Sequence, residues 1–320
     1  MKKKILIALA VLLVIGAAVA FPFVRYMYDP KDTEEAYRTN VADVAYGNTI
    51  ETALPQTELY NIIKHHFEAP LEQNKTEKKA IIIGYDGCRA DVLTEIVSGQ
   101  SGIEELTKNG GSLNLAYCGG VNYPAENTQD TSTAPGWCSI LTGYWADVHG
   151  ITGNDITKTT DTKTLLISLV EEKLADSCVF ATKWAGHFSR NNATYLEEKA
   201  YCEQNGLPVS FVKGDDDDAT HEYLKEEITK AYCNDFIFAI YEPTDSTGHN
   251  RGFTTNNPKY KEAFQKEDAM AREIITGIRN RPTYQSEDWL IIITSDHGGI
   301  KTNHGNESIQ ERMTFVAVGK

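Results

Sequence analysis

Basic residues are scarce in this chain of 320 residues, because 31 Lys and Arg stand against 45 Asp and Glu and the formal net charge is −14. Proteins that follow the phosphate backbone of nucleic acids need clustered Lys and Arg, so the deficit argues against that class of protein. Bound divalent cations would offset part of the negative charge. The hydrophobic fraction of 41% is enough for a sizeable core, so we expect a folded globular protein.

Cysteine is also infrequent, with six residues in the chain. No two of them have the close spacing of a zinc knuckle, which excludes that kind of metal site. Cys88, Cys138 and Cys178 lie in or beside apolar segments, where cysteine often stays a buried free thiol. The sequence leaves both disulfides and free thiols open.

The N-terminus differs from the rest of the chain. Lys2, Lys3 and Lys4 precede an apolar run over residues 5–24, which at about 20 residues is long enough to span a bilayer. We expect residues 1–24 to be a signal peptide or a membrane anchor, and the remainder to be extracytoplasmic, either secreted or membrane-anchored. Ala18-Val19-Ala20 fits a cleavage site, and both alternatives stay open. A buried core helix fits three terminal lysines less well.

The pattern of the remaining chain changes near residue 79. Residues 25–78 are polar and mixed, and we expect a stalk or peripheral segment with a helix near 59–67. From 79 to 320, apolar runs that alternate with helical periodicity indicate an α/β fold with a mostly parallel central sheet and helices on both faces. The expected strands are 80–84, 179–182, 236–241, 290–294 and 315–318, and the expected helices are 165–174, 222–231 and 260–278.

An acidic run over residues 215–218 follows Gly214. We expect it to be a solvated loop, with an accessory calcium site as the alternative.

Acidic residues and histidines gather where the expected strands end, which is the edge at which α/β sheets carry their functional groups. An Asp in that place is usually a turn or cap residue, and each of these residues alone is weak evidence. Together they favour a metal site. The residues are Asp86 after the first strand, Asp245 and His249 after 236–241, and Asp296, His297 and His304 after 290–294.

Three Asp and three His suit two divalent ions, because zinc accepts imidazole nitrogen and carboxylate oxygen and a catalytic site leaves positions open for substrate. We therefore expect two divalent metal ions as cofactors, with Zn²⁺ as the first choice.

A second informative segment covers residues 131–143. Pro135 near its start and Gly143 at its end predict a short helix with Thr133 as the N-cap. A phosphoryl group could bind at that helix N-terminus, and a nearby metal would lower the pKa of the Thr133 hydroxyl. The alternative is that Thr133 only caps the helix.

Seven short motifs follow one another along the chain: Gly84-Tyr85-Asp86-Gly87, Thr133-Ala134-Pro135, Ser139-Ile140-Leu141-Thr142-Gly143, His149-Gly150-Ile151, Asp245-Ser246-Thr247-Gly248-His249, Ser295-Asp296-His297-Gly298-Gly299 and His304-Gly305. Their order resembles that of the alkaline phosphatase superfamily, and most closely its nucleotide pyrophosphatase/phosphodiesterase branch. The resemblance covers residues 80–319.

The resemblance implies an alkaline phosphatase-like catalytic domain over residues 79–320 and a role for each site residue. Thr133 is the implied nucleophile, and Asn154 matches an asparagine that donates to a phosphoryl oxygen. An ordinary turn residue is the alternative for Asn154. The implied zinc ligands are Asp245, His249 and His304 for one ion, and Asp86, Asp296, His297 and the Thr133 oxygen for the other.

The activity that the resemblance implies is metal-dependent hydrolysis of phosphodiester or nucleotide pyrophosphate bonds through a phosphothreonine intermediate. The expected partners are a small phosphate ester and, if the N-terminal segment is uncleaved, the membrane. Ala134 and Gly136 stand where the branch commonly has an aromatic residue and Asn, which separates this chain from the nucleoside-binding pattern. A phosphonate hydrolase or phosphomonoesterase of the same superfamily, and a catalytically inactive extracellular binding protein on the same fold, are the alternatives.

Overall fold

The computed structural model describes residues 26–154 and 158–320. Its strands are β1 (Leu54–Pro55), β2 (Glu77–Tyr85), β3 (Ser112–Tyr117), β4 (Cys178–Thr182), β5 (Val209–Lys213), β6 (Phe236–Tyr241), β7 (Glu287–Thr294) and β8 (Met313–Gly319). Its helices are α2 (Glu34–Ala42), α3 (Glu58–Glu68), α4 (Gly102–Lys108), α5 (Thr133–Thr142), α6 (Ala146–His149), α7 (Leu165–Glu171), α8 (Leu196–Asn205), α9 (Asp217–Thr229), α10 (Pro243–Arg251), α11 (Pro258–Arg279) and α12 (Ile309–Arg312). Short 3₁₀ turns cover Ile50–Thr52, Ala90–Glu95 and Tyr284–Ser286.

The strands form one mixed sheet in the order β1-β3-β8-β7-β2-β6-β4-β5. All neighbouring pairs are parallel except those of β8, which runs antiparallel to both β3 and β7. The described chain between β7 and β8 contains only the four-residue helix α12, which is too short for the helical crossover that a parallel return needs. The predicted α/β fold with helices on both faces is confirmed, and its last strand makes the sheet mixed.

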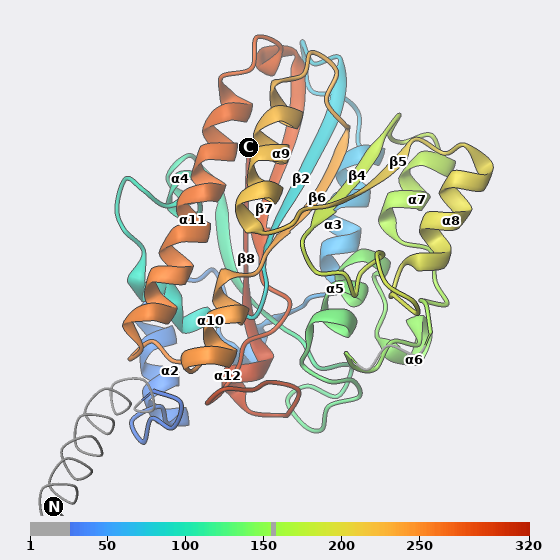
Figure 1. The fold of residues 1–320 in the computed structure, drawn as a ribbon. Coiled ribbons are helices and arrows are strands. Elements are labelled where there is room, and N and C mark those ends of the chain that lie inside the picture. Colours follow the sequence, from blue (N-terminus) through green and yellow to red (C-terminus); the bar gives the residue numbers. More distant parts are fainter. Residues whose placement is uncertain (1–25, 155–157) are drawn as a thin grey trace, which may run out of the picture.

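The core lies on both faces of the sheet, as the continuous apolar strands require. Along β2, Ile81 and Ile83 pack with residues of α9 and α11, whereas Ala80 and Ile82 pack with residues of α3, α5 and α7. This alternation follows from the period of two along a strand. Figure 1 shows α9 and α11 over one face of the sheet and α3, α5 and α7 on the other side.

Part of the chain before residue 79 packs against this domain. Helix α3 buries Leu59, Ile63 and Phe67 in the same core cluster as α5, and β1 extends the sheet beside β3. The division of the chain at residues 24 and 78 remains a prediction. The predicted segment over 1–24 lies outside the described residues, and none of the helices within 26–154 and 158–320 combines the length and apolar character needed to cross a membrane.

The acidic run that we expected to be a solvated loop begins a helix instead. Asp216 is the N-cap of α9, where its side chain accepts a hydrogen bond from the Ala219 backbone N–H, and Asp217 and Asp218 lie in the first turn. Carboxylates are favoured there because the helix dipole is positive at its N-terminus. The loop prediction was therefore wrong in its secondary structure.

The structure also chooses between the two states that the sequence left open for cysteine, because all six are buried free thiols. We predict that protein denatured without reductant reacts with a thiol reagent at six equivalents per chain, while the native protein reacts with almost none. Titration with a chromogenic disulfide before and after denaturation measures this. Fewer than six thiols in the denatured, unreduced protein would contradict the structure.

Candidate active site

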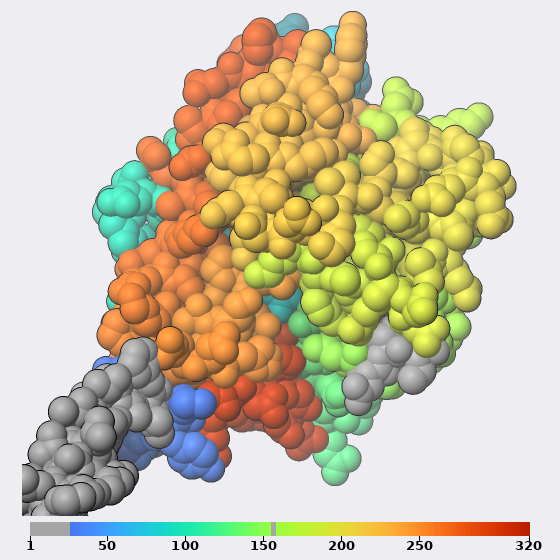
Figure 2. Space-filling view, viewed as in Figure 1, coloured from blue at the N-terminus to red at the C-terminus, as the bar shows by residue number. Residues whose placement is uncertain are grey.

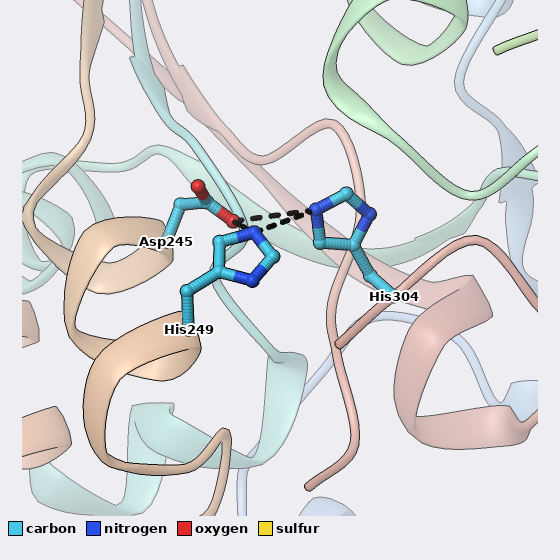
Figure 3. A group of neighbouring side chains, drawn as sticks. All are labelled: Asp245, His249 and His304. Carbon is cyan, nitrogen blue, oxygen red and sulfur yellow. Dashed lines mark hydrogen bonds and ion pairs between the residues drawn. The ribbon is translucent and has the colours of Figure 1, made fainter. Parts of the chain in front are cut away.

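The first group of site residues is Asp245, His249 and His304 (Figure 3). Asp245 and His249 lie four residues apart on α10, so one turn of helix puts both side chains on one face. The His249 and His304 Nε2 atoms lie 3.4 and 3.6 Å from Asp245 Oδ1 and 3.0 Å from each other. The His249 side chain is 41% exposed, so this group opens to solvent.

The second group is Asp86, Asp296 and His297, and all three are buried. Asp86 follows β2 and the other two follow β7, the neighbouring parallel strand. His297 Nε2 lies 3.6 Å from Asp86 Oδ1 and 3.3 Å from Asp296 Oδ2. The ring centroids of His297 and His304 are 4.1 Å apart, so the two groups adjoin.

The hydrogen bonds of the imidazoles show that these groups fit a metal. Each ring places Nδ1 within hydrogen-bond distance of a backbone carbonyl, which can only accept, so Nδ1 carries the proton and Nε2 presents a lone pair. Second-shell carbonyls orient metal-binding histidines in this way. The pairs are His249 with Thr302 O at 3.0 Å, His304 with Thr131 O at 3.1 Å and His297 with Gly298 O at 2.7 Å.

In the absence of a cation, burial disfavours the ionised forms of the side chains in both groups. Burial, followed by the charge of Asp86, raises the pKa values of Asp245 and Asp296 well above the usual range. Burial also raises the pKa of Asp86 to about 6 and lowers that of His304 to about 4. Asp245 Oδ1 and Asp296 Oδ2 are buried without a hydrogen-bond donor. A divalent cation would satisfy the carboxylate oxygens and the neutral imidazoles together.

Thr133 lies beside the second group. Its Oγ1 donates to Asp86 Oδ1 at 3.2 Å and is 3.5 Å from His297 Nε2. The predicted helix exists as α5 and ends at Gly143 in the left-handed conformation, but Ser132 is its N-cap and Thr133 its first residue. The N-cap prediction was wrong because the Ser132 carbonyl accepts the Gly136 N–H, which leaves the Thr133 hydroxyl directed at Asp86.

Trp137 is a site residue that the sequence analysis missed. Its indole N–H donates to Asp86 Oδ2 at 2.8 Å, so the two oxygens of Asp86 are held by Trp137 and Thr133. The side chain is fully buried. A Cβ on Gly136 would lie 2.9 Å from Cβ of Asp296, which explains why this helix needs a glycine beside the tryptophan.

Asn154 lies next to Thr133, the predicted nucleophile, and its side chain bonds to the start of α5. Its Oδ1 accepts the backbone N–H of Ala134 at 2.8 Å. Since the oxygen is used in this way, a bond to a phosphoryl oxygen would come from the Nδ2 group. The structure therefore brings Asn154 to Thr133 and fixes the orientation of its amide.

A buried hydrogen-bond network joins α5 to the segment that leads to Asn154. The Ile151 N–H donates to His149 Nδ1 at 3.1 Å, so His149 Nε2 carries the proton and faces Ser139 Oγ at 3.1 Å. Gln129 Nε2 bonds to Ser139 Oγ at 3.0 Å and to the Pro135 carbonyl at 3.2 Å. Burial lowers the pKa of His149 to about 4, which keeps the ring neutral. The network fixes the start of α5.

A lysine also lies at this edge of the sheet, and the sequence analysis overlooked it. Lys183 directly follows β4, and its Nζ donates to Asp217 Oδ2 at 2.7 Å. Glu242 Oε2 is 3.7 Å from the same nitrogen. Both Lys183 and Glu242 follow strands, so a search of strand ends for all charged residues, rather than for Asp and His, would have found them.

The edge that carries these residues is open on one face of the molecule. Figure 2 shows a hollow between the orange atoms around α10 and the yellow-green atoms of the chain near residue 180, with cyan atoms, the colour of β2, at its floor. The hollow lies beside α10, the helix that carries Asp245 and His249.

Two curated relatives and several solved structures resemble the chain over part of their lengths. A 2,3-bisphosphoglycerate-independent phosphoglycerate mutase from Thermococcus gammatolerans is 36% identical over 109 residues, which cover 28% of this chain and 24% of the mutase. Murine ectonucleotide pyrophosphatase/phosphodiesterase 5 is 18% identical, with a TM-score of 0.48, and the match covers 69% of this chain and 57% of that protein. The chain thus spans about a quarter of the curated mutase and just over half of the murine protein.

An alkaline phosphatase from the Antarctic bacterium TAB5 is 14% identical with a TM-score of 0.44, over 77% of this chain and 92% of that one. The model of the family described as type I phosphodiesterase/nucleotide pyrophosphatase matches residues 80–314, which are most of the chain and include every predicted ligand and Thr133. The resemblance found in the motifs is therefore confirmed at the level of the family. The chain belongs to the type I phosphodiesterase/nucleotide pyrophosphatase family, a family of hydrolases.

Proposed function

We propose that this protein is a metal-dependent phosphoesterase that cleaves phosphodiester or nucleotide pyrophosphate bonds through a phosphothreonine on Thr133. Two divalent ions, with Zn²⁺ as the first choice, are its proposed cofactors. Asp245, His249 and His304 would hold one ion, and the buried group with Thr133 would hold the other. Family membership supports the reaction class, and the residues of the site support the mechanism.

The observation that carries the proposal is the convergence of three imidazole lone pairs and three carboxylates beside one threonine hydroxyl. Two Nε2 lone pairs 3.0 Å apart, as in His249 and His304, repel each other unless a cation lies between them. A purely structural role for Thr133 would not need its hydroxyl within reach of Asp86 and His297.

The chain's own residues supply a balanced route for phosphoryl transfer. The Thr133 hydroxyl, oriented by its hydrogen bond to Asp86 Oδ1, loses its proton to water, and its Oγ1 forms a bond to phosphorus. The bond from phosphorus to the leaving oxygen breaks, and that oxygen takes up a proton from water. Asn154 Nδ2 would donate to a phosphoryl oxygen. Water then attacks phosphorus, the bond to Thr133 breaks and the hydroxyl regains a proton. Two divalent ions, when bound, stabilise the charge on the attacking and leaving oxygens.

Two displacements at phosphorus, each with inversion, predict overall retention of configuration. A phosphonate hydrolase or a phosphomonoesterase would use the same groups, and an inactive binding protein would keep them as structural metal ligands. Turnover of p-nitrophenyl phosphate, a thymidine ester and phosphonoacetate by one purified sample separates these alternatives.

We further propose that the domain acts outside the cytoplasm, either secreted or held to the membrane by residues 1–24. Three lysines ahead of an apolar run support this placement.

The test of the nucleophile compares two neighbouring hydroxyls. Thr133→Ala should lower turnover by about a thousandfold, with residual hydrolysis supported by the remaining electrostatics. Ser132→Ala is the matched control and should cost far less, since the Ser132 hydroxyl has no partner and Ser132 caps the helix with its backbone.

Mass spectrometry of enzyme quenched in acid after mixing with a fast diester substrate then locates the adduct. A phosphate adduct on Thr133 is the expected result. An adduct on Ser132, or none together with inverted configuration at phosphorus, would refute the mechanism.

Removal of metal should abolish activity, and added Zn²⁺ should restore it. Metal binding should weaken as the pH falls through about 6. Burial raises the pKa of Asp86 to about 6, so below that pH the carboxyl group must lose a proton before it can bind a cation. Below that pH the proton competes with the ion. Elemental analysis and calorimetric titration between pH 5 and 8 measure both effects. Full activity in a sample without divalent metal would contradict the proposal.

The hydrogen bond from Trp137 to Asp86 gives a second metal test. Trp137→Phe should weaken binding of one ion by about tenfold to a hundredfold, because Asp86 loses the donor that orients it. Trp289→Phe is a matched control: its indole is also buried and donates to the Glu287 carboxylate, at the opposite end of β7. Zinc titration of both variants measures the difference. Equal losses in the two variants would show that packing, rather than the bond to Asp86, accounts for the effect.

A further inference from the structure

The carboxyl edge of the sheet contains more negative charge than the two ligand groups. Asp217 and Glu242 lie beside them: Glu242 follows β6 three residues before Asp245, and its backbone N–H donates to Asp217 Oδ1 at 2.8 Å. Both carboxylates are largely buried, with side chains 12% and 11% exposed. Neither Asp217 nor Glu242 belongs to the two groups of side chains that could hold a metal ion.

Lys183 is fixed between these two carboxylates and α10. Its Nζ bonds to Asp217 Oδ2 at 2.7 Å and to Ser246 Oγ, on the residue after Asp245, at 3.4 Å. Glu242 Oε2 is 3.7 Å away. The lysine side chain is 21% exposed, so water screens its charge only in part.

Lys183 would balance the charges at this edge once two divalent ions are bound. Two divalent ions contribute four positive charges, and Lys183 contributes a fifth. If all five carboxylates are ionised in the loaded site, then Asp86, Asp217, Glu242, Asp245 and Asp296 contribute five negative charges, while the imidazoles are neutral. Without Lys183 the loaded site would have a net charge of −1 and would repel the anion that it has to bind.

We propose that Lys183 is a positioning residue that balances the charge of the active site, so that a phosphoryl anion can bind beside five carboxylates. The proposal rests on the proposed function, because it assigns the anion and the two ions to this edge. Lys183 acts through Asp217 and Glu242 rather than by contact with the phosphoryl group.

The test measures binding of inorganic phosphate to zinc-loaded protein by calorimetry, with the metal content of each sample determined in parallel. Lys183→Met should bind phosphate about tenfold more weakly, because the loaded site loses one unit of positive charge. Lys183→Arg keeps the charge and should bind within about threefold of the wild type.

Lys266→Met is the matched control, since Lys266 pairs with Asp218, the neighbour of Asp217, on the exposed surface. It should bind phosphate as the wild type does.

The double variant Lys183→Met with Glu242→Gln decides the mechanism. It removes one positive and one negative charge, so the net charge of the loaded site returns to zero and phosphate affinity should recover to near the wild-type value. It also avoids an unpaired buried carboxylate at Glu242, which keeps the test valid if the single variant folds poorly.

Three results would overturn the proposal: phosphate affinity of Lys183→Met within about twofold of wild type, a double variant as weak as the single one, or a loss of zinc in either variant.

Because the assay needs no turnover, its result is independent of the proposed function. Turnover by the wild type with unchanged phosphate binding in Lys183→Met would reject this inference alone. Weaker phosphate binding in a protein that hydrolyses no phosphoester would reject the function alone.

Discussion

The site depends on a cluster of imidazole nitrogens and carboxylate oxygens that repel one another unless a positive charge lies among them. Three Nε2 lone pairs and three carboxylates converge at one edge of the sheet, and most of them are buried. Backbone carbonyls fix the imidazoles, while Trp137 and Thr133 fix Asp86. The protein therefore holds these atoms in place without a cation, at the cost of unfavourable desolvation.

Parallel strands make this convergence possible. β2, β6 and β7 are neighbours that end at the same edge, so Asp86, Asp245 and Asp296 meet although they lie far apart in sequence. The apolar strands behind them are buried on both faces, and helix α5 brings Thr133 to the same point from outside the sheet. The scaffold supplies rigidity, and the loops and helix starts supply chemistry.

The sequence was sufficient where one physical signal was strong. Continuous apolar runs predicted the central strands β2, β6 and β7, and the Asp and His residues that follow them are the ones that the structure brings together in two groups. It failed where the signal was weak. Strands β3 and β5 were not predicted, because they have exposed or half-buried positions and no continuous apolar run. Strand β8 was predicted, but its antiparallel direction, which follows from its short connection to β7, was not.

Other features of the site depend on contacts that no sequence pattern encodes. Trp137 reads as an ordinary core residue until its N–H is seen to face Asp86, and the acidic run near residue 216 reads as a loop until Asp217 is seen to bind Lys183. The first residue of α5 could not be separated from its N-cap because the choice depends on which carbonyl accepts the Gly136 N–H. Tertiary packing makes each of these choices.

The central claim is that the two groups are separate, adjoining divalent-ion sites, with Thr133 beside the second. Diffraction from crystals of zinc-loaded protein, with data collected on both sides of the zinc absorption edge, tests it most directly. The account predicts two anomalous peaks per chain, one within reach of Asp245, His249 and His304 and one within reach of Asp86, Asp296, His297 and the Thr133 oxygen. Anomalous peaks elsewhere on the molecule, with none at these two groups in a protein that is active, would contradict it.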